Sequence, residues 1–379
     1  MRLIISNAHI VSPDLDIPSG MIVIESGKIL SVDDGAQSLP HADKLIDAGG
    51  RYVMPGFIDI HSHGADGRDV CDNSLESIRH IAKRKLSEGV TTWLPTTLTQ
   101  PQELLEQIAA TVAQYMNDQD YAKVPGLHVE GPYINRDNAG AQNPQYVRKP
   151  NWSELERILS QAPVSILSIA PDIEGAHDCI VKASRAGIIC SGAHSSATHK
   201  QVMSAKAAGL THLTHFGNAM SVLHHREIGM VGSGLLDGDL KMELICDGTH
   251  LCPDFVKLMF GVKSIDQLML ITDSMSGSWL DSGQARLGGL DVIISDGQAR
   301  LKDGGALAGS VLRFNEGIRN VFNWTGLPLA QLVKATSWNQ AQSLGLNALG
   351  KIEAGYCADI AILNEDFSVW KTLVDGEIR

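Results

Sequence analysis

The stretch Gly-Phe-Ile-Asp-Ile-His-Ser-His, residues 56–63, joins an apolar run of strand length to two histidines separated by one residue. Alternate residues of a strand point to the same side, so the imidazoles of His61 and His63 can face one metal ion. Taken alone the pair is weak evidence, because 14 histidines placed at random give about half a His-x-His per chain of this length. Whether this pair binds a metal therefore depends on the residues found in the rest of the chain.

Seven further strand-length apolar runs follow, separated by longer stretches, of which residues 74–88 and 102–116 have helical spacing. The eight runs lie near residues 56–60, 90–94, 124–129, 164–169, 188–191, 210–214, 242–246 and 268–272. Strands that alternate with helices are typical of β-α units around a parallel sheet, and eight units over about 290 residues fit a closed barrel. We therefore expect an α/β fold with a (β/α)8, TIM-like barrel over residues 53–345.

The two ends of the chain have a different pattern. Residues 1–52 carry short β-rich runs divided by Gly and Pro turns, and strand-sized pieces recur after residue 346. We expect residues 1–52 and 346–379 to pair into one small β-sandwich domain.

Composition excludes several classes of protein. Hydrophobic residues at 44% and charged residues at 20% are near globular averages. A net charge of -12 disfavours nucleic-acid binding, and no run approaches the roughly 18 apolar residues of a membrane span. The first residues lack the features of a signal peptide, and the six cysteines form no Cys-x-x-Cys pair. We expect a cytoplasmic protein without nucleic-acid or membrane partners.

Polar residues fall at the ends of the predicted strands. Glu130 closes the third strand, where a buried carboxylate would be costly unless it met a cation. His194 and His215 follow the fifth and sixth strands, and Asp273 ends the eighth. Because the carboxyl ends of barrel strands share one face, we expect a metal site there. The predicted ligands are His61, His63, Glu130, His194, His215 and Asp273. Such ligands suit zinc, our first expectation, and also iron, manganese or cobalt.

Five blocks of sequence resemble motifs of the N-acetylglucosamine-6-phosphate deacetylase family of the amidohydrolase superfamily, in family order and over essentially the whole chain. They are Met-Pro-Gly-Phe-Ile-Asp (54–59), His-Val-Glu-Gly-Pro-Tyr-Ile-Asn (128–135), Gly-Asn-Ala-Met (217–220) with Arg226-Glu227, Asp-Gly-Thr-His (247–250) and Leu-Ala-Gly-Ser (307–310). The resemblance implies a metal-dependent hydrolase that removes acetyl from an N-acetyl amino-sugar 6-phosphate, N-acetylglucosamine-6-phosphate or a close epimer.

The resemblance also implies roles for the predicted ligands. Glu130, His194 and His215 would be the core metal ligands, and Asp273 the catalytic acid-base residue. His61 and His63 would form a second metal position, so that one or two ions bind per chain with Glu130 bridging them. Asp273 would take the proton of the attacking water and deliver it to the departing amine.

A substrate pocket is implied in the same way. Its expected residues are Ala141, Gln142, Asn218, Ala219, Arg226, His250, Leu307, Ala308 and Gly309. Arg226 would hold the phosphate, because a guanidinium presents a planar fork of donors. Gln142 stands where the family usually has a histidine and cannot become a cation, which leaves the epimer or acyl group open. The resemblance further suggests a homodimer, in which the neighbouring subunit can complete the pocket.

Two other functions stay open. Amidohydrolases of this fold also act on N-acyl amino acids, cyclic amides or nucleobases, and the phosphate-binding residues argue against these substrates. A non-catalytic relative would usually have lost metal ligands, whereas every expected position is filled. Among residues outside the site, we expect His128 to pack against it or support it, and Cys246 and Cys252 to be buried structural thiols.

Overall fold

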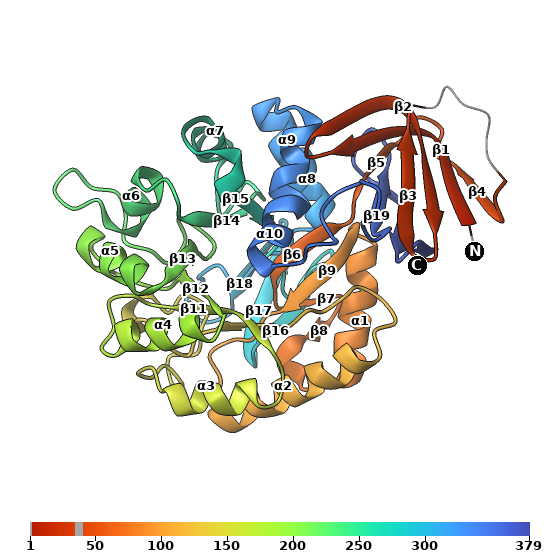
Figure 1. Ribbon diagram of the computed structural model, residues 1–379. Coiled ribbons are helices and arrows are strands. Elements are labelled where there is room, and N and C mark those ends of the chain that lie inside the picture. Colours follow the sequence, from red (N-terminus) through yellow and green to blue (C-terminus); the bar gives the residue numbers. More distant parts are fainter. Residues whose placement is uncertain (1, 35–40) are drawn as a thin grey trace.

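The computed structural model describes residues 2–34 and 41–379, and within them eight parallel strands form a barrel (Figure 1). The strands are β6 (Phe57–Ser62), β9 (Val90–Pro95), β10 (Leu127–Glu130), β11 (Val164–Ile169), β12 (Ile189–Gly192), β13 (Leu210–Leu213), β14 (Lys241–Ile245) and β15 (Leu268–Ile271). All eight coincide with predicted strands, although β10 begins three residues later than expected.

The ring of strands closes through single bridges rather than continuous ladders. Strands β10 to β15 form one six-stranded sheet in sequence order, and β6 pairs with β9. A bridge from Thr96 to His128 joins β9 to β10, and a bridge from Ser62 to Ser274 joins β6 to the end of β15. The Asp273 amide also donates to the His61 carbonyl at 2.9 Å. The predicted barrel is confirmed.

Helices surround the barrel (Figure 1). They are α1 (Leu75–Leu86), α2 (Gln102–Asn117), α3 (Trp152–Leu159), α4 (Ala176–Arg185), α5 (His199–Ala208), α6 (Gly229–Leu236), α7 (Pro253–Val262), α8 (Phe314–Thr325), α9 (Leu329–Val333) and α10 (Asn339–Leu344). α1 begins at Ser74, whose side chain accepts from the Ser77 amide, and buries Ile78 and Ile81 toward the barrel. Across the described residues, no helix has the length and apolar composition needed to cross a bilayer.

The two chain ends pair in one eight-stranded sheet, in which both termini lie close together (Figure 1). Its strands are β1 (Arg2–Ser12), β2 (Leu15–Glu25), β3 (Lys28–Asp33), β4 (Lys44–Asp47), β5 (Tyr52–Pro55), β19 (Ile360–Leu363), β20 (Val369–Val374) and β21 (Glu377–Ile378). β5 connects the ends, because it pairs with β1 on one side and β19 on the other. We propose that residues 1–52 and 346–379 form a domain with its own core.

A small three-stranded sheet that the sequence patterns did not reveal follows the last barrel strand. It consists of β16 (Gly283–Leu287), β17 (Leu290–Ser295) and β18 (Gln298–Leu301). Its Leu287 and Val292 share an apolar cluster with Leu98 and Met275, which follow β9 and β15. This sheet therefore lies against the carboxyl ends of the barrel strands, where the predicted site residues are.

One ion-pair cluster joins the barrel to the terminal sheet and predicts a stability effect. Lys123 Nζ lies 2.9 Å from Asp359 Oδ2 and 2.7 Å from Asp375 Oδ1. Lys123→Met should lower the free energy of unfolding by about 1–3 kcal/mol, because Asp359 is only 4% exposed and would lose its cation. Thermal unfolding, with the exposed Lys200→Met as control, measures the loss. Equal melting temperatures for the two variants would contradict this role.

Candidate metal centre and active site

The six predicted metal ligands meet at the carboxyl ends of the barrel strands, and each is at most 7% exposed. Their donor atoms form two groups, in each of which all atoms lie within 4.8 Å of one another. One group is His61, His63 and Asp273, and the other is Glu130, His194 and His215. Residues distant in sequence are therefore brought together as the strand-end argument predicted.

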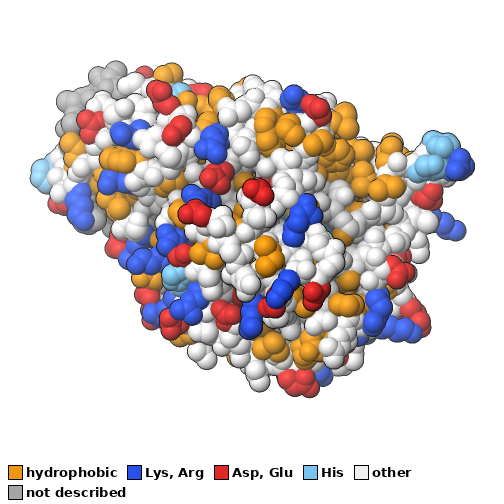
Figure 2. Space-filling model, turned by 180° about the vertical axis from the view of Figure 1, so that it is seen from behind, with side chains coloured by type: hydrophobic (Ala, Val, Ile, Leu, Met, Phe, Trp, Pro, Cys, Tyr) orange, Lys and Arg blue, Asp and Glu red, His pale blue; other side chains and the backbone are white. Residues whose placement is uncertain are grey.

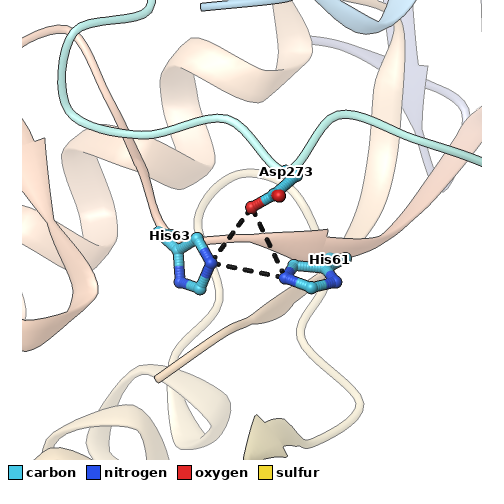
Figure 3. Close-up of side chains that lie close together, drawn as sticks. All are labelled: His61, His63 and Asp273. Atoms are coloured by element: carbon cyan, nitrogen blue, oxygen red, sulfur yellow. Dashed lines mark hydrogen bonds and ion pairs between the residues drawn. The ribbon is translucent and has the colours of Figure 1, made fainter. Parts of the chain in front are cut away.

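The first group is drawn in Figure 3, where Asp273 points between the two imidazole rings from the segment that follows β15. His61 Nε2 lies 3.3 Å from His63 Nε2. Asp273 Oδ1 lies 3.5 Å from the first of these nitrogens and 3.1 Å from the second. Three ligand atoms thus surround one point.

Glu130 lies between the two groups. Its Oε1 lies 3.2 Å from His194 Nε2 and 3.0 Å from His215 Nε2, and these two nitrogens are 3.1 Å apart. Its Oε2 lies 3.3 Å from His63 Nε2. One carboxylate oxygen therefore faces each group, which is the arrangement that a bridging carboxylate requires.

The hydrogen bonds of the imidazoles show that the donor set fits a metal ion. Nδ1 of His61 bonds to Glu243 Oε2 at 3.0 Å, and Nδ1 of His63 bonds to the Thr96 carbonyl at 3.0 Å. Nδ1 of His194 likewise bonds to the Asn138 carbonyl at 2.8 Å. In neutral rings the proton is then on Nδ1, and each Nε2 presents a lone pair. The lone pairs of His61 Nε2 and His63 Nε2, 3.3 Å apart, repel unless a cation lies between them.

The electrostatics of the site agree with that fit. Burial raises the pKa of Asp273, but the charge of His61 and the hydrogen bond from His63 outweigh it and bring the pKa to about 2. Burial lowers the pKa of His63, whereas hydrogen bonds to Asp273 and Glu130 raise it to about 9. Protons and a metal ion therefore compete for the same nitrogen.

Backbone conformation directs three ligands into the site. His194, His215 and Asp273 follow β12, β13 and β15 with φ of 44°, 33° and 48°. Such left-handed values are uncommon for residues other than glycine, and each costs on the order of 1 kcal/mol unless the surroundings stabilise it. Three strained residues in one site indicate that ligand direction is set by the fold.

Glu243 is a site residue that sequence reasoning missed. It lies in β14, is fully buried, and accepts from His61 Nδ1 and, at 3.4 Å, from the His215 amide. Its signal in the sequence is a carboxylate between the apolar residues Met242 and Leu244 of a strand. His128 has the supporting position expected of it, because its ring bonds to the Ile60 carbonyl at 2.8 Å and to Ser168 Oγ at 2.7 Å.

A pocket of about 360 Å³ opens over the donor atoms. Seven of the expected substrate residues line it: Ala141, Gln142, Asn218, Ala219, His250, Leu307 and Gly309. Ala308 does not line it, because its side chain is fully buried in an apolar cluster with Met275. The Asp247 carboxylate, 2.7 Å from His250 Nδ1, outweighs the effect of burial and raises the pKa of His250.

Gln142 is held in place by two hydrogen bonds. Its Nε2 donates to Glu130 Oε2 at 2.7 Å, and its Oε1 accepts from the Thr99 amide at 2.6 Å. The side chain is 4% exposed. Gln142 thus lines the pocket and also fixes the orientation of the Glu130 carboxylate.

Two expectations need correction. Arg226 does not line the pocket of its own chain, because residues 222–227 form an exposed turn in which Arg226 Nη1 bonds only to the neighbouring His225 ring. Sequence position alone does not reveal this outward direction. Cys252 is exposed rather than buried, because it immediately precedes α7 at its surface end, whereas Cys246 is buried as expected.

The two donor groups predict a metal stoichiometry. Removing the imidazoles of the first group by His61→Ala with His63→Ala should lower the zinc content of chelator-treated, reloaded protein by about one ion per chain, because Glu130, His194 and His215 remain. Elemental analysis measures the content, and the exposed His177→Ala is the control. Equal content in the double variant and the wild type would remove the second position.

Comparison with known proteins agrees with this geometry. Residues 52–379 match the amidohydrolase family. The N-acetylglucosamine-6-phosphate deacetylase of Lysinibacillus sphaericus is 33% identical, with 100% of this chain and 98% of the relative covered. The N-acetylgalactosamine-6-phosphate deacetylase of Escherichia coli O157:H7 is 34% identical, with 86% and 87% covered. A mutant N-acetyl-D-glucosamine-6-phosphate deacetylase of Mycobacterium smegmatis, solved in complex with N-acetyl-D-glucosamine-6-phosphate, superposes with a TM-score of 0.93 at 28% identity over 100% and 99% of the two chains. The chain therefore belongs to the amidohydrolase family and, within it, to the N-acetylglucosamine-6-phosphate deacetylases.

Proposed function

We propose that this protein hydrolyses the acetyl group from an N-acetyl amino-sugar 6-phosphate, either N-acetylglucosamine-6-phosphate or an epimer such as N-acetylgalactosamine-6-phosphate. The observation that carries the proposal is the carboxylate of Asp273, which belongs to one of two neighbouring groups of metal-ligating atoms and lines a pocket large enough for a sugar. Relatives named for both substrates support it. Gln142, which stands where the family usually has a histidine, leaves the preferred epimer to be measured.

We infer that the six predicted metal ligands hold one or two divalent ions. Zinc is the metal we expect first, and iron, manganese and cobalt are the alternatives. When bound in such a site, a divalent ion polarises a carbonyl and makes a water easier to deprotonate. Five of the six residues line the pocket and can face the acetamide of a substrate, and they are His63, Glu130, His194, His215 and Asp273.

Asp273 is the acid-base residue in this proposal. Its carboxylate lies at the metal-ligating atoms of His61 and His63, where it can accept the proton of the attacking water. It then delivers that proton to the amide nitrogen, which leaves readily only as a protonated amine. Glu130, held by Gln142, keeps the histidines of both groups in place while the carbonyl carbon is attacked.

A phosphate in the pocket needs a cationic partner. Among the described residues no Lys or Arg lines the pocket, and the net charge of -12 gives no general attraction for anions. His250, whose pKa is raised, can hydrogen-bond to the phosphate from within the pocket. We propose that the Arg226 of a second copy supplies the guanidinium at the mouth of the pocket.

The surface around Arg226 supports such a homodimer. Apolar side chains beside the turn are 47–72% exposed, namely Val222, Leu223, Leu236, Leu258 and Val262. Figure 2 shows hydrophobic side chains gathered next to a protrusion that ends in histidine and Lys or Arg side chains. An exposed apolar patch of this kind is typical of an interface, and a twofold dimer would place each protrusion on the partner. We also propose a cytoplasmic location, in keeping with six unpaired cysteines.

Asp273→Asn should retain metal but lower kcat by at least roughly 10³-fold, because an amide cannot carry the proton in both directions. Steady-state kinetics with elemental analysis of the same preparation measure the two effects. The exposed Asp178→Asn is the control. A variant that keeps more than a tenth of wild-type turnover would exclude Asp273 from proton transfer.

Arg226→Ala should lower kcat/KM for the phosphorylated substrate by about ten- to two-hundred-fold, because it removes one charged hydrogen-bonded contact. The slow hydrolysis of the unphosphorylated N-acetyl sugar should stay unchanged, because that substrate does not use the contact. The assay compares N-acetylglucosamine, N-acetylgalactosamine and N-acetylmannosamine with their 6-phosphates. If the unphosphorylated sugars are preferred, or if both classes lose equally, the sugar-phosphate assignment is wrong and an N-acyl amino acid or cyclic amide becomes the leading substrate class.

Mixing the two variants tests whether Arg226 acts across the interface. A hybrid dimer of Arg226→Ala and Asp273→Asn subunits contains one site with both native residues if Arg226 serves the partner. Dissociation and reassociation of an equal mixture should therefore restore about a quarter of wild-type activity, given random pairing. No gain over the separate variants would show that Arg226 does not serve the other subunit.

A further inference from the structure

Behind Asp273, on the side away from the pocket, lies a buried ion cluster that the proposed mechanism does not use. Its centre is Lys85 of α1, which is fully buried. Lys85 Nζ lies 3.0 Å from Asp59 Oδ2 and 3.4 Å from Glu88 Oε2, and both carboxylates are also fully buried. A buried ammonium is costly unless it is paired and fully hydrogen-bonded, so this cluster requires an explanation.

The remaining bonds of Lys85 reach both neighbours of Asp273 in the chain. Lys85 Nζ donates to Ser274 Oγ at 2.9 Å and to Thr272 Oγ1 at 3.2 Å. Asp273 itself has a left-handed backbone and turns its side chain toward His61 and His63. The residues on either side of Asp273 are therefore fixed by one cation while Asp273 points the opposite way.

The cluster also occupies the seam at which the barrel closes. No continuous ladder joins β6 to β15 within residues 2–34 and 41–379, and side chains add to the few backbone bonds between residues 61–64 and 273–274. Asp59 Oδ2 accepts from Thr272 Oγ1 at 2.6 Å, and Asp59 Oδ1 accepts from the Thr272 amide at 3.2 Å. The same Oδ1 lies 3.4 Å from the His61 amide. The pair formed by Asp59 and Lys85 thus connects the strand of His61 and His63 to the strand end of Asp273.

Glu88 secures the cluster from the outside. Its Oε1 accepts from Trp279 Nε1 at 2.9 Å, and its Oε2 accepts from the Phe314 amide at 3.1 Å. Every charged group of the cluster therefore has several partners. Lys85 cannot move without breaking contacts to β6, to the segment after β15 and to Glu88, which is itself bonded to the first residue of α8. Such a fixed cluster transmits a defined geometry to the residues bonded to it.

We propose that Lys85 is a positioning residue that sets the geometry of the His61, His63 and Asp273 group from behind. Removing its charge would free the two flanks of Asp273 and leave Asp59 unpaired beneath His61. The Glu130, His194 and His215 group has no direct contact with the cluster in the described hydrogen bonds. It would be affected less, because only Glu130 and Glu243 connect it to the first group. The kinetic part of this inference rests on the proposed deacetylase function, whereas the metal-binding part does not.

Lys85→Met keeps the length of the aliphatic chain and removes the charge. It should lower kcat at least 30-fold with KM within about threefold, because misplacement of a reacting group by about 1 Å costs on the order of 10²-fold. Zinc titration of the apoprotein should show the last ion per chain bound at least tenfold more weakly. Ser274→Ala removes one bond of Lys85 together with the Ser274 Oγ contacts to Ser62 Oγ and the Gly64 carbonyl. It should lower kcat about five- to tenfold and serves if Lys85→Met does not fold.

Lys123→Met is the matched control, because Lys123 is also paired with two carboxylates but lies far from the site in the interface with the terminal sheet. It should lose stability while kcat and zinc affinity stay unchanged. The inference is overturned if Lys85→Met, or Ser274→Ala in its place, retains both wild-type kcat and wild-type zinc affinity, or if Lys123→Met shows the same losses. If the wild type hydrolyses no N-acetyl amino-sugar phosphate, the proposed function fails and the zinc titration alone decides the role of Lys85.

Discussion

The repulsion among buried donor atoms is the constraint on which the rest of the structure depends. Four imidazole Nε2 atoms and two carboxylates meet within a few ångströms at the carboxyl end of the barrel, and all six side chains are buried. Their lone pairs and negative charges favour a cation, and protons and divalent metals are the two cations that fit. The groups around the site favour the metal, because they hold the Nδ1 protons of three of the histidines and so leave Nε2 free.

Much of the fold maintains this convergence. The barrel supplies strand ends at one height, left-handed residues turn His194, His215 and Asp273 inward, and the hairpins after β15 wall the pocket with Leu287 and Leu307. The first metal group spans the seam between β6 and β15. His61 lies in β6 and Asp273 follows β15, and no continuous ladder joins these two strands in the described ring. Charged side chains at that seam cost desolvation free energy that apolar side chains would not. In return they fix the orientation of the residues they bond, because hydrogen bonds are directional and apolar contacts are not.

The sequence predicts the barrel and the convergence of six polar side chains at one end of it for a physical reason. Buried parallel strands are continuous apolar runs, and polar residues that follow them are conspicuous, as His61, Glu130 and Asp273 show. The roles of these residues came from the family resemblance rather than from periodicity. The direction in which a loop projects is harder to predict, because nothing in the sequence around Arg226 indicates that its turn points away from the pocket. Residues inside elements were also missed: Glu243 lies within a strand, and Lys85 lies in a helix whose other lysines and arginines indicate an exposed face.

The claim at the centre of this description is that the two donor groups bind metal in one shared site. Anomalous diffraction from crystals of zinc-loaded protein, collected on both sides of the zinc absorption edge, tests it most directly. A shared metal site predicts an anomalous peak among Glu130, His194 and His215, with a second peak among His61, His63 and Asp273 at high zinc concentration. Zinc-loaded crystals that show no peak within this cluster, or peaks only at surface residues, would contradict it.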